Sequence, residues 1–289
     1  MALNVRTSIV FIYENYVDIS AALTPSSELA TLPATNIKFK SRTKCWRTNG
    51  FDTSNKEYIT IDFGSVRSVA ALGLVNHNLG TSGTANITLM GNASNTWGSP
   101  LYSEDFDLTE GYMTTPYTSA IVYDSNRLVK PPLLRILNQF FSTQSNYAYR
   151  YWRIKFNTKP SAGYVEIGKI FLCDAFIPSS NFIYGINHSL VDLSEIKSSS
   201  YGYLTANKKD IVQEFELEIK NLPDEEAYNS FLKMYYAVGQ TEYFIMSLNP
   251  WYGFTKVQQT VYCRFTSELK KTMPGNNRNS FKISVREVL

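Results

Sequence analysis

At 289 residues the chain is long enough for two compact domains, since a single hydrophobic core usually serves about 100 to 200 residues. Hydrophobic residues make up 44% of it and charged residues only 18%, which describes a globular protein whose surface depends on Asn, Ser, Thr and Tyr. The net charge of +3 comes from scattered Lys and Arg, so neither a phosphate-tracking groove nor a direct nucleic-acid partner is expected.

The aromatic and cysteine residues indicate the type of fold and the cellular compartment in which the protein is made. The 20 Tyr and 17 Phe favour β structure and protein contact surfaces. Cys45, Cys173 and Cys263 are far apart and odd in number, which predicts three buried, reduced thiols. The apolar stretch 8–13 is too short for a signal peptide or a membrane span. We therefore expect synthesis in a cytosol, without secretion and with no membrane partner.

Short alternating runs from residue 58 onward predict strands separated by turns. In the run 58–64, Ile59, Ile61 and Phe63 share one face, which is typical of a strand covered on one side. The run 68–79 is more uniformly apolar, as expected of a central strand. Further strands are predicted at 85–92, 147–158 and 164–174, with a loop-rich stretch at 94–144 and a turn at 159–163.

A segment with Pro and Ser at 175–181 separates two patterns, so we place the domains at 1–178 and 179–289. The second domain contains the one good helix pattern, near 223–238. Pro223 suits its first turn, the acids that follow suit the positive end of the helix dipole, and Gly239 ends it. Strands are expected at 182–193, 201–222, 242–249, 257–269 and 278–289, with a hairpin turn at Pro274.

The ordered runs LPATNI, KCWRT, YITIDFGSVRSVAALGLVNHNL, ANITLMGNAS, YAYRYWRIKF and GYVEIGKIFL make residues 30–175 resemble the galactose-binding-like family, also called discoidin or coagulation factor C-type domains. The positions that match the pattern of that family are Trp46, Asp62, Phe63, Gly64, Tyr151, Arg153, Ile154, Glu166 and Ile167. The resemblance implies a jelly roll with Trp46 in its core, and members often bind glycans or lipid head groups. Many members join their termini by a disulfide, but Cys45 and Cys173 are not at the matching positions, which argues against an oxidised extracellular protein.

The variant VNHNL also resembles a group of tailed-bacteriophage virion proteins, and the element order of the second half is similar to phage tail-tube, distal-tail and baseplate units. The fold expected is mainly β, with an N-terminal jelly-roll β-sandwich followed by a smaller β-sandwich domain carrying one α-helix. The resemblance implies a structural component of a virion, assembled in the host cytoplasm with other virion proteins and with copies of itself in a ring. The alternative is a carbohydrate-binding module that attaches a particle to a host-surface glycan.

Four residues of the first domain are candidates for a ligand site: Trp97, His77, Asn78 and Tyr112. Trp97 lies among Asn, Thr, Gly and Ser, so we expect it to be exposed and to meet a neighbouring subunit or, as the alternative, a sugar. His77 either lines the mouth of the jelly roll or, as we favour, bonds to the backbone at a strand end.

Aromatic residues mark two candidate subunit contacts. Tyr201 and Tyr203 belong to a polar hairpin around 198–210 that can project beyond a sheet and pair with a neighbouring chain, although an ordinary surface hairpin is the alternative. Trp251, Tyr252 and Phe254 cluster on one short loop, which is easiest to explain if a partner buries them.

Catalytic and metal chemistry have little support in the sequence. The only two histidines, His77 and His188, fall in different domains, which disfavours a nucleophile–base pair. Glu104, Asp105 and Asp107 could surround a calcium ion, but their alternation with an aromatic residue favours a strand face. We expect no enzyme, no cofactor and no metal, and a glycan-processing hydrolase is the least favoured alternative.

Overall fold

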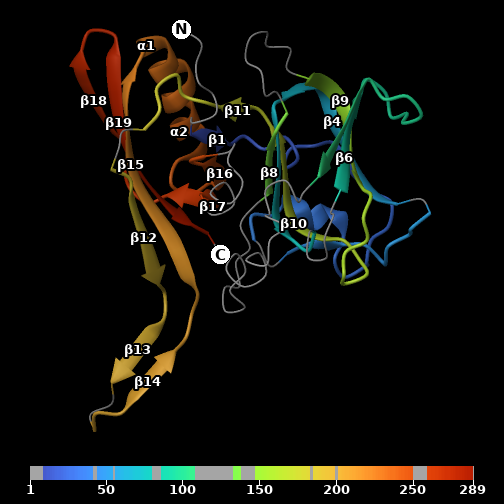
Figure 1. Cartoon of the computed structure of the whole chain (residues 1–289), viewed down its shortest axis with the longest axis horizontal. Coiled ribbons are helices and arrows are strands. Elements are labelled where there is room, and N and C mark those ends of the chain that lie inside the picture. The colour runs from blue at the N-terminus through green and yellow to red at the C-terminus, as the bar shows by residue number, and fades with distance from the viewer. Residues whose placement is uncertain are drawn as a thin grey trace.

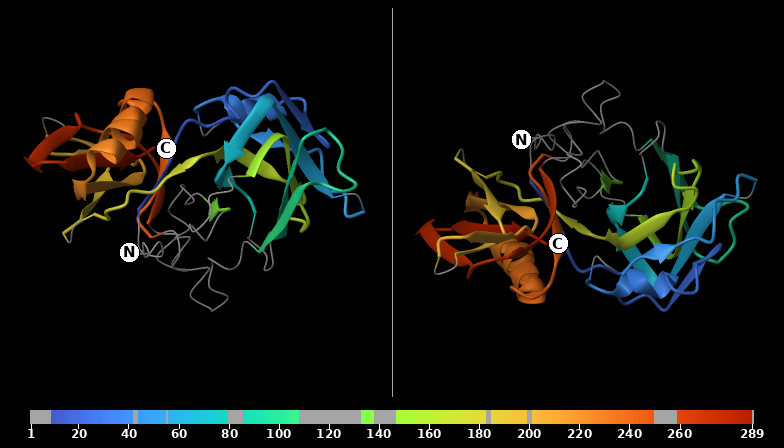
Figure 2. Two further views of the ribbon diagram at one scale, coloured as in Figure 1. Left: turned by 90° about the horizontal axis from the view of Figure 1, so that it is seen from above. Right: turned by 90° about the horizontal axis from the view of Figure 1, so that it is seen from below.

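The computed structural model describes residues 9–41, 44–54, 56–79, 86–107, 133–137, 147–182, 185–198, 201–249 and 259–288. Within these ranges the chain is mainly β with one helical segment of 15 residues, so the expected fold class is confirmed. The strands form sheets of eight, five, four and two strands. A β-sandwich and a sheet-and-helix part lie side by side, and a long arm extends from the latter (Figures 1 and 2).

The sandwich consists of a five-stranded sheet in the order β2-β4-β9-β6-β7 and a four-stranded sheet in the order β3-β10-β5-β8, both antiparallel. The bounds are β2 Ala22–Pro25, β3 Trp46–Arg47, β4 Glu57–Val69, β5 Ala71–His77, β6 Asn86–Asn92, β7 Tyr102–Asp107, β8 Leu133–Ile136, β9 Tyr147–Phe156 and β10 Glu166–Cys173, with a 3-10 helix η2 at Ala34–Lys38. The strands predicted in this half are present. β7 and β8 add two strands within the stretch that the sequence presented as loop-rich.

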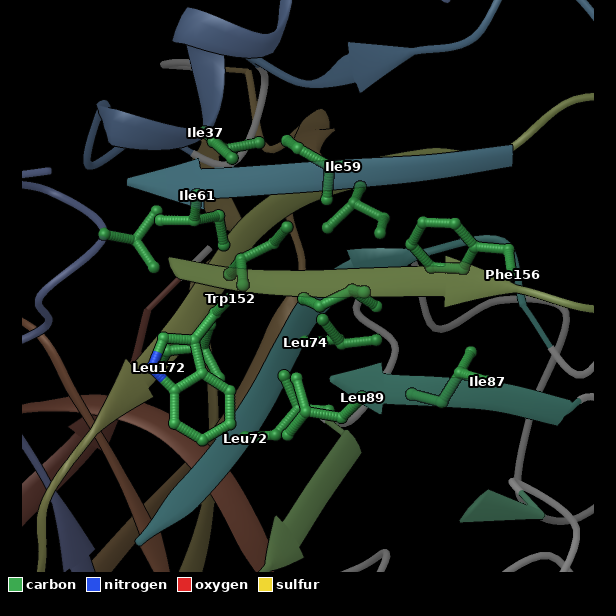
Figure 3. Packing of buried hydrophobic residues seen from close by; sticks show 14 of the residues in the cluster. Ile37, Ile59, Ile61, Leu72, Leu74, Ile87, Leu89, Trp152, Phe156 and Leu172 are labelled. Carbon is green, nitrogen blue, oxygen red and sulfur yellow. The ribbon is translucent and has the colours of Figure 1, made fainter. Parts of the chain in front are cut away.

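The sandwich core forms because alternate residues of each strand turn toward the opposite sheet. Ile59 and Leu74, from the two different sheets, meet there together with Trp152 (Figure 3). Trp46 is fully buried, as the family resemblance implies, and its indole N–H donates to the carbonyl of Ser27 at 3.2 Å. This hydrogen bond replaces the one that the indole N–H would make with water if the ring were exposed.

The second part is built on the eight-stranded sheet, whose path is β11-β1-β16-β17-β19-β15-β12 with β18 paired to β19. The bounds are β1 Val10–Ile12, β11 Ala175–Phe176, β12 Asn187–Asp192, β15 Ile211–Leu222, β16 Phe244–Ser247, β17 Thr260–Phe265, β18 Lys270–Gly275 and β19 Arg278–Glu287. The β18–β19 pair confirms the hairpin predicted at Pro274.

The helical segment covers one face of this sheet. It comprises α1 at Asp224–Glu226, a π-helical stretch η4 at Ala227–Leu232 and α2 at Lys233–Val238. Its stripe of Ala227, Phe231, Met234 and Val238 is buried in the core that it shares with the sheet. The segment ends at Gly239, whose φ of 53° is a conformation that glycine adopts without strain. The predicted helix is therefore confirmed.

The other face of the eight-stranded sheet packs against the sandwich. Val10, Ile245 and Tyr262 from this sheet share a buried cluster with Val75 and Phe171 from the four-stranded sheet. The protein is therefore layered, with the four-stranded sheet buried on both of its faces. This explains why the run 68–79 is more uniformly apolar, above all at 71–75 within β5, since a strand covered on both sides has no face for water.

Strand β1 belongs to the second sheet although it comes from the N-terminal end of the chain. It lies between β11 and β16, with Phe11 in the core on the helix side and Val10 and Ile12 in the cluster on the sandwich side. Burial on both faces accounts for its unbroken apolar sequence. The division into 1–178 and 179–289 stays a prediction, and the pairing of β1 is a feature that the sequence did not indicate.

The arm, residues 187–216, begins as the pair β12 and β15 and ends in the two-stranded sheet of β13 Glu195–Ser198 and β14 Leu204–Asn207. Figure 1 shows that it points away from both layered parts. The strand predicted at 182–193 is present as β12, whereas the one predicted at 201–222 is divided into β14 and β15, so that the arm contains two separate ladders.

Candidate functional site: two binding surfaces

The tip of the arm has two chemically different faces. Ile196 pairs with Ala206 and Ser198 pairs with Leu204, and residues directly opposite in an antiparallel pair project to the same side. Three apolar side chains therefore share one face with a single serine. The opposite face carries Glu195, Lys197, Thr205 and Asn207.

The apolar face of the tip is open to solvent. Ile196 is 70% exposed and Leu204 is 72% exposed, and every residue of β13 and β14 is exposed. The predicted contact residues Tyr201 and Tyr203 lie in the turn between these strands, and Tyr201 is 88% exposed. Apolar side chains gathered at one exposed place usually mark an interaction site.

A second surface lies on the outer face of the five-stranded sheet. Arg153 of β9 pairs with Thr60 of β4 and with Met90 of β6, so the three side chains form a row across the sheet. The guanidinium carbon lies 4.0 Å from the ring centroid of Tyr58 and 4.5 Å from that of Trp97. Nε donates to Thr60 Oγ1 at 2.8 Å. Tyr58, Thr60, Trp97 and Arg153 are called the Arg153 cluster below.

Arg153 has no carboxylate partner in the described part of the chain. Burial lowers the pKa of its guanidinium, and the neighbouring Tyr58 acts in the opposite direction. Arg150, on the same strand, instead binds Asp62 with both Nε and Nη2, at 2.8 and 2.9 Å. Arg153 is thus a partly desolvated cation held by two rings and one hydroxyl.

Of the predicted ligand residues that the structure describes, Trp97 lies apart from His77 and Asn78. Trp97 is partly exposed on the outer face, where its indole N–H donates to Asn95 Oδ1 at 2.8 Å. His77 ends β5 in the other sheet and is only 3% exposed, so its ring is not presented to a ligand in solvent. Asn78 donates to the carbonyl of Tyr164 at 2.7 Å, which ties the end of β5 to the segment before β10.

The predicted ligand residue Tyr112 and three of the predicted contact residues, Trp251, Tyr252 and Phe254, lie outside the described residues. Their proposed roles stay predictions.

The other reactive groups in the described part of the chain form no third candidate site. All three cysteines are free and buried, and burial raises the pKa of Cys173 and Cys263 well above the usual value. The acidic run 104–107 lies in strand β7, as its alternation predicted. Among the described residues no group of three His, Cys, Asp or Glu side chains could hold a metal ion. In the same part of the chain, no helix combines the length and apolarity that a membrane span requires.

Neither a known protein family nor a curated protein matches the sequence. Among solved structures, a fucose-binding module of Streptococcus pneumoniae is 9% identical with a TM-score of 0.37, covering 56% of this chain and 98% of that one. The galactose-bound family 32 carbohydrate-binding module of C. perfringens NanJ is 12% identical (TM-score 0.35; 58% and 99% covered). A chitosan-binding module of Paenibacillus is 14% identical (TM-score 0.37; 56% and 100% covered). With TM-scores this low, none of them bears on what this chain binds.

The sequence does not indicate the Arg153 cluster as a unit. Arg153 stands out only as a position of the family pattern, and Tyr58 and Thr60 belong to the strand predicted at 58–64. The available signal was the outward register of β4 and β9, since residues that alternate with Ile59 and Ile154 must face away from the core. No pattern in the nearby sequence indicates that the loop 93–100 places Trp97 over this face.

Proposed function

We propose that this protein is a non-enzymatic assembly protein that binds neighbouring copies of itself through the apolar face of its arm. The observation that carries the proposal is the exposure of Ile196 and Leu204 on one face of a two-stranded hairpin. An isolated hairpin is marginally stable in water, so a partner that covers this face would stabilise it. Burying each of these two side chains contributes about 1.5–3 kcal/mol to the free energy of association. The two together would therefore supply a large part of the binding energy of such a contact.

A matched pair of double variants tests this proposal. Ile196→Ser with Leu204→Ser removes the apolar face, and Lys197→Ser with Thr205→Ala changes the opposite face of the same hairpin. Sedimentation velocity over a range of concentrations should show self-association of the unmodified protein and of the second variant, weakened about tenfold or more in the first. A protein that stays monomeric at the highest concentration, or two variants that behave alike, would contradict the proposal.

We further infer that the assembly is the virion of a tailed bacteriophage, with the protein in the tail, distal tail or baseplate. This location depends on the sequence resemblance around VNHNL and on element order, and the solved structures named above are not virus proteins. Mass spectrometry of purified particles from the source phage should detect the chain together with tail components. Its absence from intact particles would exclude the location while leaving self-association open.

Saccharide binding by the jelly roll is the second candidate function. The observation that favours it is the Arg153 cluster, which offers two aromatic rings and a guanidinium on an outer sheet face. A glycan array probed with the full chain should give signals that Trp97→Ala removes. An empty array at high protein concentration would eliminate this candidate.

A further inference from the structure

We propose that the Arg153 cluster is the binding site for a carboxylate-bearing saccharide, with Arg153 as the group that recognises the carboxylate. This inference rests on the second candidate function and names its ligand class. The sugar would lie on the outer face of β4, β9 and β6, and its acid group would meet the guanidinium.

The orientation of the guanidinium is already fixed before a ligand arrives. Thr60 Oγ1 accepts the Nε–H at 2.8 Å, and the rings of Tyr58 and Trp97 contact the guanidinium at 4.0 and 4.5 Å. Arginine has five N–H donors in a planar fork, so four remain on Nη1 and Nη2. Such a fork matches the two oxygens of a carboxylate, and pre-orientation reduces the entropy lost when they bind.

The groups next to Arg153 favour an anion. Asp105 lies on the same outer face, opposite Thr88 of β6, but its Oδ1 accepts a hydrogen bond from the Thr88 hydroxyl and not from Arg153. Within the described residues Arg153 has no carboxylate partner, and Lys155, two residues along the same face of β9, forms no ion pair. The nearest acid on the paired strand, Asp62, is held by Arg150 at 2.8 Å and so does not neutralise Arg153. A partly buried cation without a counter-ion gains more from an incoming anion than a fully solvated one does.

The surroundings favour a sugar acid as the source of the carboxylate. Trp97 remains partly exposed beside the cation and is carried by the loop 93–100, whose other residues are mostly Ser, Asn, Thr and Gly. A site with a few oriented polar groups next to an aromatic ring suits a ligand that has both a ring with C–H faces and hydroxyl groups. A uronic acid residue supplies the flat ring, the hydroxyls and one carboxylate together.

Titration of the full chain with two probes tests the inference. The acidic probe is tri-galacturonic acid and the neutral probe is galactotriose, and the readout is the indole N–H resonance of Trp97. We expect the acidic probe to shift this resonance and to bind about tenfold or more tightly than the neutral one. Its affinity should fall with added salt, because the contact is between charges.

Three variants assign the effect to one guanidinium. Arg153→Gln should abolish the preference for the acidic probe, and Arg153→Lys should keep only part of it. Arg264→Gln, which removes an arginine of β17 in the second sheet, is the control that should keep all of it. Thermal unfolding checks that each variant is folded. Equal binding of both probes would overturn the inference while leaving saccharide binding intact, and binding of neither would overturn both. Retention of the acidic preference by Arg153→Gln would also overturn the inference.

Discussion

Substitution of Gly73 should report directly on the packing of the sandwich against the second sheet. A Cβ atom at this position would lie 2.5 Å from Ile245 Cδ1 and 3.2 Å from Phe171 Cβ. Carbon atoms in contact are normally about 3.5–4.0 Å apart, so the first overlap is about 1 Å. Gly73→Ala must therefore displace Ile245 within a filled cluster. We expect a loss of about 1–3 kcal/mol in the free energy of unfolding, the usual cost of overpacking a core.

A second substitution tests whether the named atom causes the loss. Ile245→Val removes Cδ1 and alone should cost about 0.5–1.5 kcal/mol. In the double variant the new methyl group of residue 73 occupies part of the vacated space. The two changes should therefore cost about 1 kcal/mol less together than the sum of their separate effects.

Urea unfolding followed by tryptophan fluorescence measures all of these free energies. Gly50→Ala is the control, because no atom lies within 4 Å of a Cβ built there, and its effect should stay within about 0.5 kcal/mol. The reasoning is refuted if Gly73→Ala is as harmless as the control. It is also refuted if Gly73→Ala and Ile245→Val are simply additive, since the two sheets would then not meet at this point.

Three further predictions concern buried groups. Lys169→Met removes the bonds of 2.8 and 2.9 Å to Asp18 and should cost about 1–3 kcal/mol at pH 7. Burial raises the pKa of Asp18 and Lys169 lowers it, so this pKa rises further in the variant. Equal losses of stability at pH 7 and at about pH 2, where Asp18 is protonated in the folded and the unfolded state, would contradict this. Cys173 and Cys263 should resist a thiol reagent in the native protein and react in denaturant, and rapid native labelling of both would refute their burial. Trp152→Ala should cost about 3–5 kcal/mol by urea unfolding, because the ring is fully buried, and a loss below about 1 kcal/mol would argue against that burial.

Local periodicity was sufficient to predict most of the sandwich and the helix. Ile59 and Ile61 alternate with polar residues because one face of β4 meets the core, and the stripe from Ala227 to Val238 repeats at helical spacing because one side meets a sheet. In both cases the pattern along the chain records the burial directly. Such elements can be predicted without knowing their neighbours.

The arrangement of the two parts depends on contacts that leave no local pattern. The apolar stretch at β1 is compatible with many positions, and only its pairing with β11 and β16 places it in the second sheet. The residues predicted for a ligand site show the same dependence on contacts between distant parts of the chain. Trp97 and His77 are 20 residues apart in the sequence, but His77 ends β5 of the four-stranded sheet, whereas Trp97 lies on a loop over the five-stranded sheet. There Trp97 meets Arg153, which comes from a strand far along the chain.

The two candidate surfaces belong to different parts of the molecule, which leads to a final prediction. The Arg153 cluster lies on the outer face of the sandwich, whereas the arm extends from the sheet-and-helix part (Figure 1). Neither surface contributes a described residue to the other, so Arg153→Gln should leave self-association unchanged and the serine variants of Ile196 and Leu204 should leave saccharide binding unchanged. Sedimentation velocity and the Trp97 resonance measure the two properties separately. A variant that weakens both would contradict independence and would require a coupling through the shared cluster at Ile245 and Phe171.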